Sequence, residues 1–228
     1  MPSYTSNDKN VEVVVYEPQR SGTFPALIVV HGSSGPVSSF VGNYAQQLAN
    51  FGYVVFFVHY FDATATSYAS FSGIQRNFRI WLAVIADGIN FAQRHAKVDS
   101  ARIGLLGVSL GGYLSLSLAS RDARVTAVVS LMGGMPPEVI SATHDMPPAL
   151  LLHGEADPVV PVSEAYAVER LLKTLGTKYE LKTYPGQGPS FRGVAQLDAL
   201  TRTLKFLSRH LKNEKVFLPI RELLLNFR

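Results

Sequence analysis

The residues with the clearest potential for chemistry are the five from Gly107 to Gly111, which read Gly-Val-Ser-Leu-Gly. They match the pattern Gly-x-Ser-x-Gly, in which a serine hydroxyl is the nucleophile. An apolar stretch of strand length, Arg102–Leu106, precedes them, and a helical stretch that contains Tyr113 follows. A sharp turn between a strand and a helix exposes the hydroxyl, and the glycines leave room for neighbouring backbone. Ser109 is therefore the predicted nucleophile. The plain alternative is a glycine-rich helix start without chemical use.

The same turn predicts where a negatively charged intermediate would be stabilised. N–H groups in the first turn of a helix, including that of Leu110, have no acceptor within the helix and can donate to an oxyanion. A second donor is expected from the loop 31–35, which follows the apolar stretch Phe24–Val30. Its glycines let the N–H of Ser33 or Ser34 approach a substrate oxygen. We interpret His31 itself as structural.

A carboxylate that could assist the serine follows another apolar stretch, Ala149–Leu152. Asp157 lies in the loop after this stretch, at the edge of the sheet where the serine is expected. An aspartate there would fix the tautomer of a histidine and stabilise its protonated form. Glu155 is the nearest alternative for this role. Asp157 could also simply shape a turn before Pro158.

Strand and helix patterns alternate along the whole chain. Continuous apolar strands separated by amphipathic helices predict an α/β fold, with a mostly parallel central sheet, helices on both faces and no large lid. We expect one domain over residues 1–228, and a helix over 163–175 with Ser163 as its N-cap and Gly176 as its C-terminal stop. The other expected strands are 11–16, 24–30, 53–58, 102–108, 125–132, 149–153 and 179–184, and the other helices are 41–50, 74–95, 113–119 and 194–211.

Composition excludes several functional classes. The chain has 228 residues, of which 47% are hydrophobic, and none is cysteine. These values argue against a disordered chain, and they exclude a thiol nucleophile and a cysteine-based zinc site. The net charge of +4 is too small to indicate nucleic acid. The apolar runs are too short for a membrane span, and the polar N-terminus does not resemble a signal peptide, so we expect a cytoplasmic protein. The sequence contains no metal-binding cluster and no phosphate-binding glycine loop, so we expect no cofactor.

Several motifs occur together in a fixed order: His31-Gly32, Gly107–Gly112, His153–Pro161, and Tyr184-Pro185-Gly186 before Phe191. In this respect the chain resembles the dienelactone hydrolase family of α/β-hydrolases over roughly residues 11–211. The resemblance implies hydrolysis of small carboxylic esters or lactones by a Cys or Ser nucleophile, which here would be Ser109.

The chain departs from this family at the catalytic base. The resemblance implies a histidine in a stretch Tyr-Pro-Gly-x-x-His-x-Phe, whereas residues 184–191 read Tyr-Pro-Gly-Gln-Gly-Pro-Ser-Phe. Pro189 therefore occupies the position of the histidine, and proline cannot accept a proton from Ser109. His59 and His144 could face the site, and we expect the remaining histidines to be structural or on the surface: His31, His95, His153 and His210.

Two functional hypotheses follow. The glycines and the aspartate of the site are retained, which favours an otherwise functional hydrolase that is inactive or severely impaired for lack of its base. The alternative is a non-catalytic protein that binds a small molecule in the same pocket. We expect a compact apolar pocket for a small soluble ester or lactone, lined by Tyr60, Phe61, Tyr113 and Met135.

The last residues, 212–228, interrupt the strand–helix alternation. They are rich in large apolar side chains: Val216, Phe217, Leu218, Ile220, Leu223, Leu224, Leu225 and Phe227. The plain interpretation is an apolar C-terminal tail that forms a helix folded back on the body. The sharper one is a contact with a second copy of the chain or with a membrane surface, because these side chains need cover.

The hypothesis of a contact between copies predicts that deletion of residues 214–228 lowers the mass of the particle in solution. Light scattering on the full and the shortened chain measures this mass directly. An unchanged mass would rule out this role of the tail.

Overall fold

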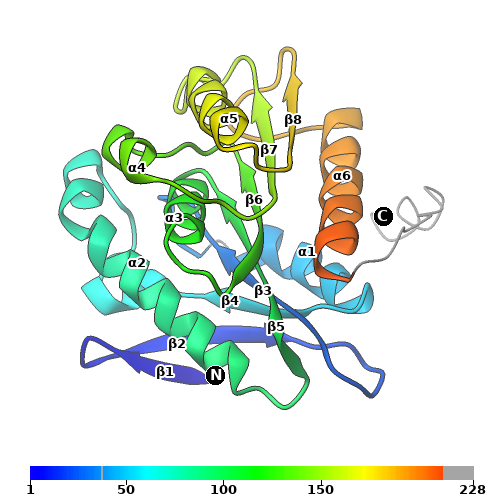
Figure 1. Ribbon diagram of the computed structural model, residues 1–228. Coiled ribbons are helices and arrows are strands. Elements are labelled where there is room, and N and C mark those ends of the chain that lie inside the picture. Colours follow the sequence, from blue (N-terminus) through cyan, green and yellow to red (C-terminus); the bar gives the residue numbers. More distant parts are fainter. Residues whose placement is uncertain (37, 213–228) are drawn as a thin grey trace.

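A single twisted sheet forms the centre of the protein (Figure 1). The computed structural model describes residues 1–36 and 38–212, so the predicted apolar tail beyond 212 lies outside the described residues. In the described part, eight strands are ordered β1-β2-β4-β3-β5-β6-β7-β8. Their bounds are β1 Ser3–Ser6, β2 Lys9–Tyr16, β3 Phe24–Val30, β4 Val54–Val58, β5 Val98–Val108, β6 Val125–Leu131, β7 Ala149–Gly154 and β8 Tyr179–Tyr184.

The central strands are parallel, as the continuous apolar stretches predict. Every residue of β3, β4 and β7 is buried, which requires cover on both faces of the sheet. β1 and β2 run antiparallel at one edge, and the pairs from β4 to β8 are parallel. The carboxyl ends of the parallel strands therefore share one edge, where open α/β sheets bind ligands.

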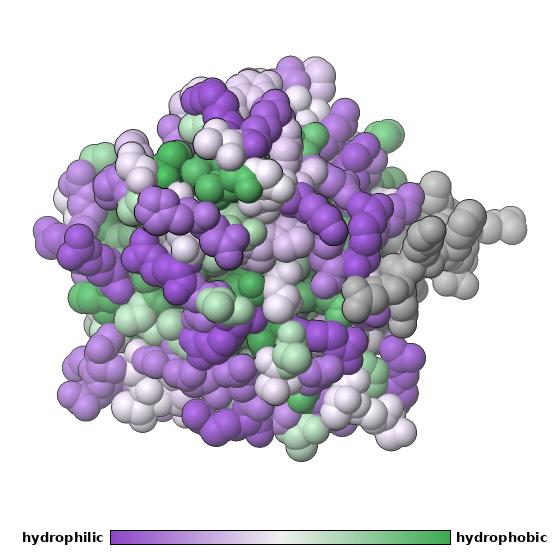
Figure 2. Space-filling model, viewed as in Figure 1, coloured by the Kyte–Doolittle hydropathy of each residue, from purple (hydrophilic) through white to green (hydrophobic). Residues whose placement is uncertain are grey.

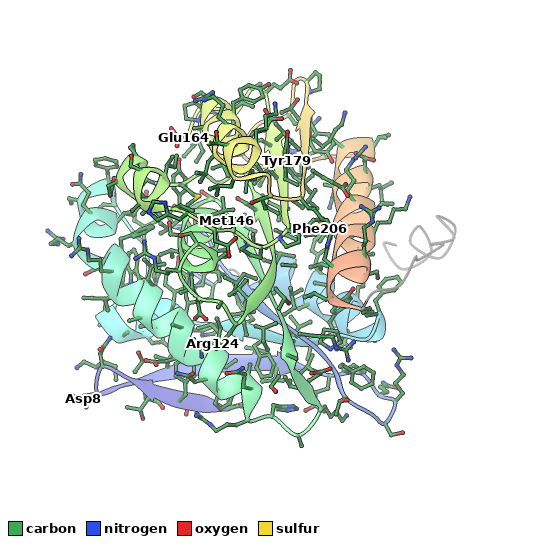
Figure 3. The ribbon with its side chains drawn as sticks, in the orientation of Figure 1. Asp8, Arg124, Met146, Glu164, Tyr179 and Phe206 are labelled. Carbon is green, nitrogen blue, oxygen red and sulfur yellow. The ribbon has the colours of Figure 1, made fainter. Side chains whose placement is uncertain are left out.

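Helices cover both faces of the sheet. α2 (Phe71–Gln93), α3 (Leu110–Ala119) and α5 (Ser163–Leu175) pack on one face, while α1 (Ser38–Asn50) and α6 (Val194–Leu211) pack on the other. Figure 3 shows Met146 near α3 and Phe206 between α6 and the sheet. The two side chains belong to separate apolar cores, one on each face of the sheet.

Three short elements depart from the predicted pattern. β1 reads Ser-Tyr-Thr-Ser and buries only alternate residues, so no apolar run marks it. α4 (Pro137–Ala142) lies between two expected strands, where no helix is predicted. The 3-10 helix η1 (Tyr60–Thr64) begins two residues after the end of β4 and is not predicted either. Each is too short for a clear periodic signal.

The predicted ends of α5 are half right. Gly176 ends the helix in the left-handed conformation with φ +67°, as expected. The prediction of Ser163 as N-cap is wrong, because Val162 occupies that position and makes no side-chain capping bond. The helix starts instead from a backbone turn, in which the Glu164 N–H donates to the Pro161 carbonyl at 3.0 Å.

Polar and charged side chains cover most of the face seen in Figure 2, and hydrophobic residues appear between them in small patches. Within the described ranges, no helix is both long and apolar enough to cross a membrane.

Candidate active site

A strained turn places Ser109 at the carboxyl edge of the sheet, between the end of β5 and the start of α3. Its φ of 54° and ψ of −118° are unusual for a residue with a side chain. A Cβ atom on Gly107 would lie 2.0 Å from the Gly111 carbonyl oxygen, and one on Gly111 would lie 2.1 Å from the Val30 oxygen. Only glycine fits these two positions, so the protein has the sharp turn that the Gly-x-Ser-x-Gly pattern predicts.

The loop after β3 lies directly beside this turn. A Cβ atom on Gly32 would be 3.5 Å from the Cβ of Ser109. The carbonyl of Ser33 accepts a 2.9 Å hydrogen bond from the Ala69 N–H, which holds the loop from its outer side. The structure therefore brings the loop with Ser33 and Ser34 next to Ser109 and to Leu110, the first residue of α3. These are the expected donors to an oxyanion.

His31 is buried and structural, in line with its interpretation from the sequence. Its Nδ1–H donates to the Gly32 carbonyl at 2.8 Å, and its ring stacks on Tyr60 with 4.1 Å between centroids. The Tyr60 hydroxyl donates to the His31 carbonyl at 2.9 Å. Burial disfavours the charged imidazole and lowers the pKa of His31 to about 4, although the bond to Gly32 acts in the opposite direction.

Three of the four predicted pocket residues belong to the core instead. Tyr60, Phe61 and Met135 are at most 1% exposed and pack in the apolar cluster on the α2 and α3 face. Tyr60 and Phe61 are held there by ring contacts with His31 and Trp81. They pack against the loop after β3, and they line neither of the two cavities described below.

The fourth residue, Tyr113, lies in the first turn of α3 and is partly buried. Its pKa is raised, first by burial and then by the negative charges of Glu164 and Asp157. The charges of Glu164 and Asp157 thus both act on a side chain of the helix that Ser109 precedes.

Asp157 is buried, and only one of its two carboxylate oxygens is hydrogen-bonded among the described residues. Its Oδ1 accepts hydrogen bonds from the N–H groups of Val159 at 2.8 Å and Val160 at 3.0 Å. Its Oδ2 is buried and has no hydrogen-bond partner among the described residues. Glu155, the alternative acid, is exposed and accepts a 2.7 Å bond from the Thr183 hydroxyl. The geometry therefore favours Asp157 as the carboxylate of the site.

The loop between β8 and α6 packs on the loop that carries Asp157. The Ala156 N–H donates to the Gln187 carbonyl at 2.9 Å. A Cβ atom on Gly154 would come within 2.5 Å of the Gly188 oxygen. Pro189 follows at once and shares the lining of a cavity with Val108, the residue before Ser109. Pro189 thus lies at the same edge of the sheet as both Ser109 and Asp157.

The positions of the six histidines show whether any of them is bonded to Ser109. In the described part of the chain, which includes all six, no hydrogen bond joins an imidazole to the Ser109 hydroxyl. His153 is buried and donates from Nε2 to the Val160 carbonyl at 2.8 Å, and the His59 ring lies 4.0 Å from the Glu12 carboxylate. The remaining three lie in a loop or near helix ends: His95, His144 and His210.

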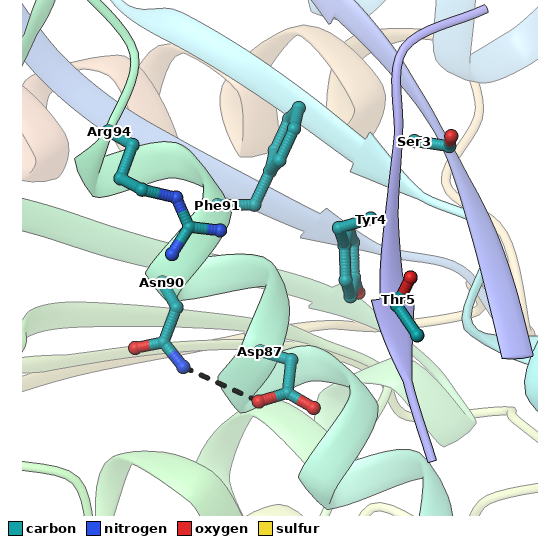
Figure 4. A pocket seen from close by; sticks show the side chains of 7 residues that line it. All are labelled: Ser3, Tyr4, Thr5, Asp87, Asn90, Phe91 and Arg94. Atoms are coloured by element: carbon teal, nitrogen blue, oxygen red, sulfur yellow. Dashed lines mark hydrogen bonds between the residues drawn. The ribbon is translucent and has the colours of Figure 1, made fainter. Parts of the chain in front are cut away.

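Two cavities accompany these elements. An apolar cavity of about 320 Å³ lies between α1, α6 and the sheet, and Met132 and Pro189 line it. A larger cavity of about 490 Å³ lies between β1 and α2, where the Asn90 amide donates to Asp87 (Figure 4). Three strands separate β1 from β5, so the second cavity belongs to another part of the sheet.

One group of side chains could in principle hold a metal ion. Ligand atoms of Glu12, His59 and Asp62 all lie within 4.8 Å of one another. However, Asp62 already accepts a 3.0 Å hydrogen bond from the Glu12 N–H, which accounts for their proximity without a metal.

The sequence and the fold of the chain are similar to those of known proteins. The model of the dienelactone hydrolase family matches residues 11–209. The bile acid-CoA:amino acid N-acyltransferase of Mus musculus is 26% identical over 72% of the chain and 35% of its own length. The quorum-quenching protein AidA of Acinetobacter baumannii is 28% identical over 56% of the chain and 41% of its own length. The chain thus spans less than half the length of these two relatives.

A solved structure shows the same fold. It is described as a dienelactone hydrolase-like promiscuous phosphotriesterase from metagenomic libraries, and it superimposes with a TM-score of 0.79 at 17% identity. The match covers 91% of this chain and 96% of the other. The α/β-hydrolase fold expected from the sequence is confirmed.

The low pKa of His31 predicts a specific loss of stability in acid. The unfolded chain binds a proton near pH 6.5, whereas folded His31 does so only near pH 4. Between these values the unfolded state holds more protons, so the free energy of unfolding falls as pH falls, by up to about 1.4 kcal/mol per pH unit. Below pH 4 this contribution stops changing.

Urea unfolding of the wild type and of His31→Gln, measured at several values between pH 7 and pH 4, tests this. Carboxylates contribute equally to both proteins, so the difference between the two curves isolates His31. Parallel curves would contradict the burial of a neutral imidazole.

Proposed function

The chain belongs to the dienelactone hydrolase family, and we propose that it binds a small carboxylic ester or lactone at the carboxyl edge of its sheet, with Ser109 as nucleophile. We further propose that turnover is severely impaired, because Pro189 stands where the family pattern has its basic histidine.

The observation that supports this proposal best is the Asp157 Oδ2, a buried oxygen without a hydrogen-bond partner among the described residues. A buried carboxylate oxygen without a partner is costly, and buried polar groups are nearly always hydrogen-bonded. The Asp157 Oδ2 lacks such a partner among the described residues, while the loop with Pro189 packs on its own loop. An imidazole N–H at position 189 is the partner that a catalytic aspartate holds. The carboxylate therefore supports the assignment of position 189 to the base.

The residues present can perform part of the reaction. The hydroxyl of Ser109 attacks the ester carbonyl, and the N–H groups of Leu110 and of Ser33 or Ser34 stabilise the oxyanion that forms. The hydroxyl proton must leave at the same time, and proline cannot accept it. In a serine protease, loss of the histidine lowers kcat by about a millionfold and leaves roughly 10³–10⁴-fold catalysis over water. Slow hydrolysis of activated esters is the expected residual activity.

A second function, binding without turnover, uses the same residues. The observation that favours it is the place of Pro189 in the lining of the apolar cavity, where it adds contact surface for a bound molecule. The two proposals differ only in whether restoring the base restores catalysis.

Restoring the base is expected to increase activity. Pro189→His should hydrolyse p-nitrophenyl acetate at least about a hundredfold faster than the wild type, since a positioned general base contributes roughly 10²–10⁴-fold. Release of p-nitrophenolate measures the rate. Equal rates for the two proteins would contradict the assignment of position 189, and would favour binding without turnover.

Three variants control for an imidazole that acts without the site. Pro185→His adds a histidine in the same loop, at an exposed position, and should leave the rate unchanged. In the Pro189→His background, Ser109→Ala should remove the gain completely. Asp157→Asn in that background should remove most of it, because the amide no longer stabilises the charged imidazole.

A further inference from the structure

We propose that the apolar cavity between α1 and α6 binds the aliphatic acyl chain of the substrate, which makes esters of medium-length fatty acids the preferred class. This inference rests on the proposed function of Ser109 and narrows it. The cavity lies on the opposite face of the sheet from the pocket that the sequence predicted. Its lining comes from the central strands, α1, α6 and the loop before α6, and includes Val29, Leu48, Leu106, Leu131, Phe191 and Leu200.

Three lining residues lie close to the proposed nucleophile: Val108, Leu131 and Met132. Val108 directly precedes Ser109, and the Ser109 N–H donates to the carbonyl of Leu131 at 2.8 Å. Met132 follows Leu131 and also lines the cavity. The apolar lining therefore reaches the residues next to the turn that carries Ser109.

The polar side chains in the inner lining are already paired. Gln196 donates to the Tyr44 hydroxyl, and the Thr203 hydroxyl donates to the Ala199 carbonyl at 2.8 Å. Ser190, by contrast, is exposed. Gln196 and Thr203 already make hydrogen bonds within the protein, so they do not need a polar ligand as partner. The remaining walls of the cavity are apolar. An aliphatic chain fits this surface best, since each buried methylene strengthens binding about fourfold.

The size of the cavity limits the occupant. Its volume of about 320 Å³ is at the small end of the range for ligand pockets, roughly 300–1,000 Å³. It therefore suits a single chain of moderate length rather than a lipid with two acyl chains.

Exposed apolar residues near the site agree with an apolar substrate. Tyr68 and Phe71 are 66% and 77% exposed, and they flank Ala69, which binds the carbonyl of Ser33. Val159 is 70% exposed and lies two residues after Asp157. These side chains lie on segments that follow the carboxyl ends of β4 and β7.

The experiment measures binding of acetate, butanoate and octanoate to the full chain by isothermal titration calorimetry. We expect octanoate to bind at least tenfold more tightly than butanoate, and acetate more weakly still. Ala199→Phe fills the cavity and should weaken octanoate binding at least tenfold. The matched control Ala96→Phe adds the same ring at an exposed turn before β5, at the other end of the sheet, and should bind octanoate like the wild type.

Equal affinity for the three acids in the wild type would overturn the proposal, and this result does not depend on the folding of any variant. Octanoate binding that survives in Ala199→Phe, in a protein whose circular dichroism matches the wild type, would overturn it as well. Binding needs no chemistry at Ser109, so a chain-length dependence together with an inactive Pro189→His variant would separate a correct acyl pocket from a failed hydrolase assignment.

Discussion

The backbone contact between Gly111 and the carbonyl of Val30 is the constraint on which the site depends. It brings the first turn of α3 against the end of β3, closer than any side chain would allow. As a consequence, Ser109 takes its strained conformation and Gly32 comes to lie beside it. The hydroxyl proposed as nucleophile and the two segments proposed to supply oxyanion donors are thus brought together by backbone packing.

Backbone packing fixes only one of the two carboxylate oxygens of Asp157. Two backbone N–H groups hold Oδ1 of Asp157 in place, so the orientation of the carboxylate is fixed by its own loop. The second oxygen has no hydrogen-bond partner among the described residues, and Pro189, in the loop before α6, has no hydrogen to donate. If position 189 is that of the base, as proposed, the carboxylate is held in place although its partner there is a proline.

The sequence predicts the strands of the centre well, because β3, β4 and β7 are buried on both faces and read as unbroken apolar runs. The Gly-x-Ser-x-Gly pattern predicts the turn for another reason: its glycines stand where a Cβ atom is excluded, at Gly107 by the Gly111 carbonyl and at Gly111 by the Val30 carbonyl. The pocket could not be predicted in this way. Its walls come from α1 and α6, which are about 150 residues apart, as the hydrogen bond between Gln196 and Tyr44 illustrates. Tyr60 and Phe61, which have the residue types of a pocket, are buried because they pack on His31.

Proline at position 189 affects two properties of the site at once. If Ser109 acts as proposed, the proline leaves no side chain at this position that can accept its proton, and it adds apolar surface to a cavity that is already apolar. Without the proton acceptor, the free-energy barrier to acyl transfer is higher. The apolar contacts that bind an acyl chain are kept, so binding is expected to be less affected than the reaction rate. A hydrolase without its base and a binding protein are therefore neighbouring states of the same scaffold, separated by one proton acceptor rather than by a different architecture.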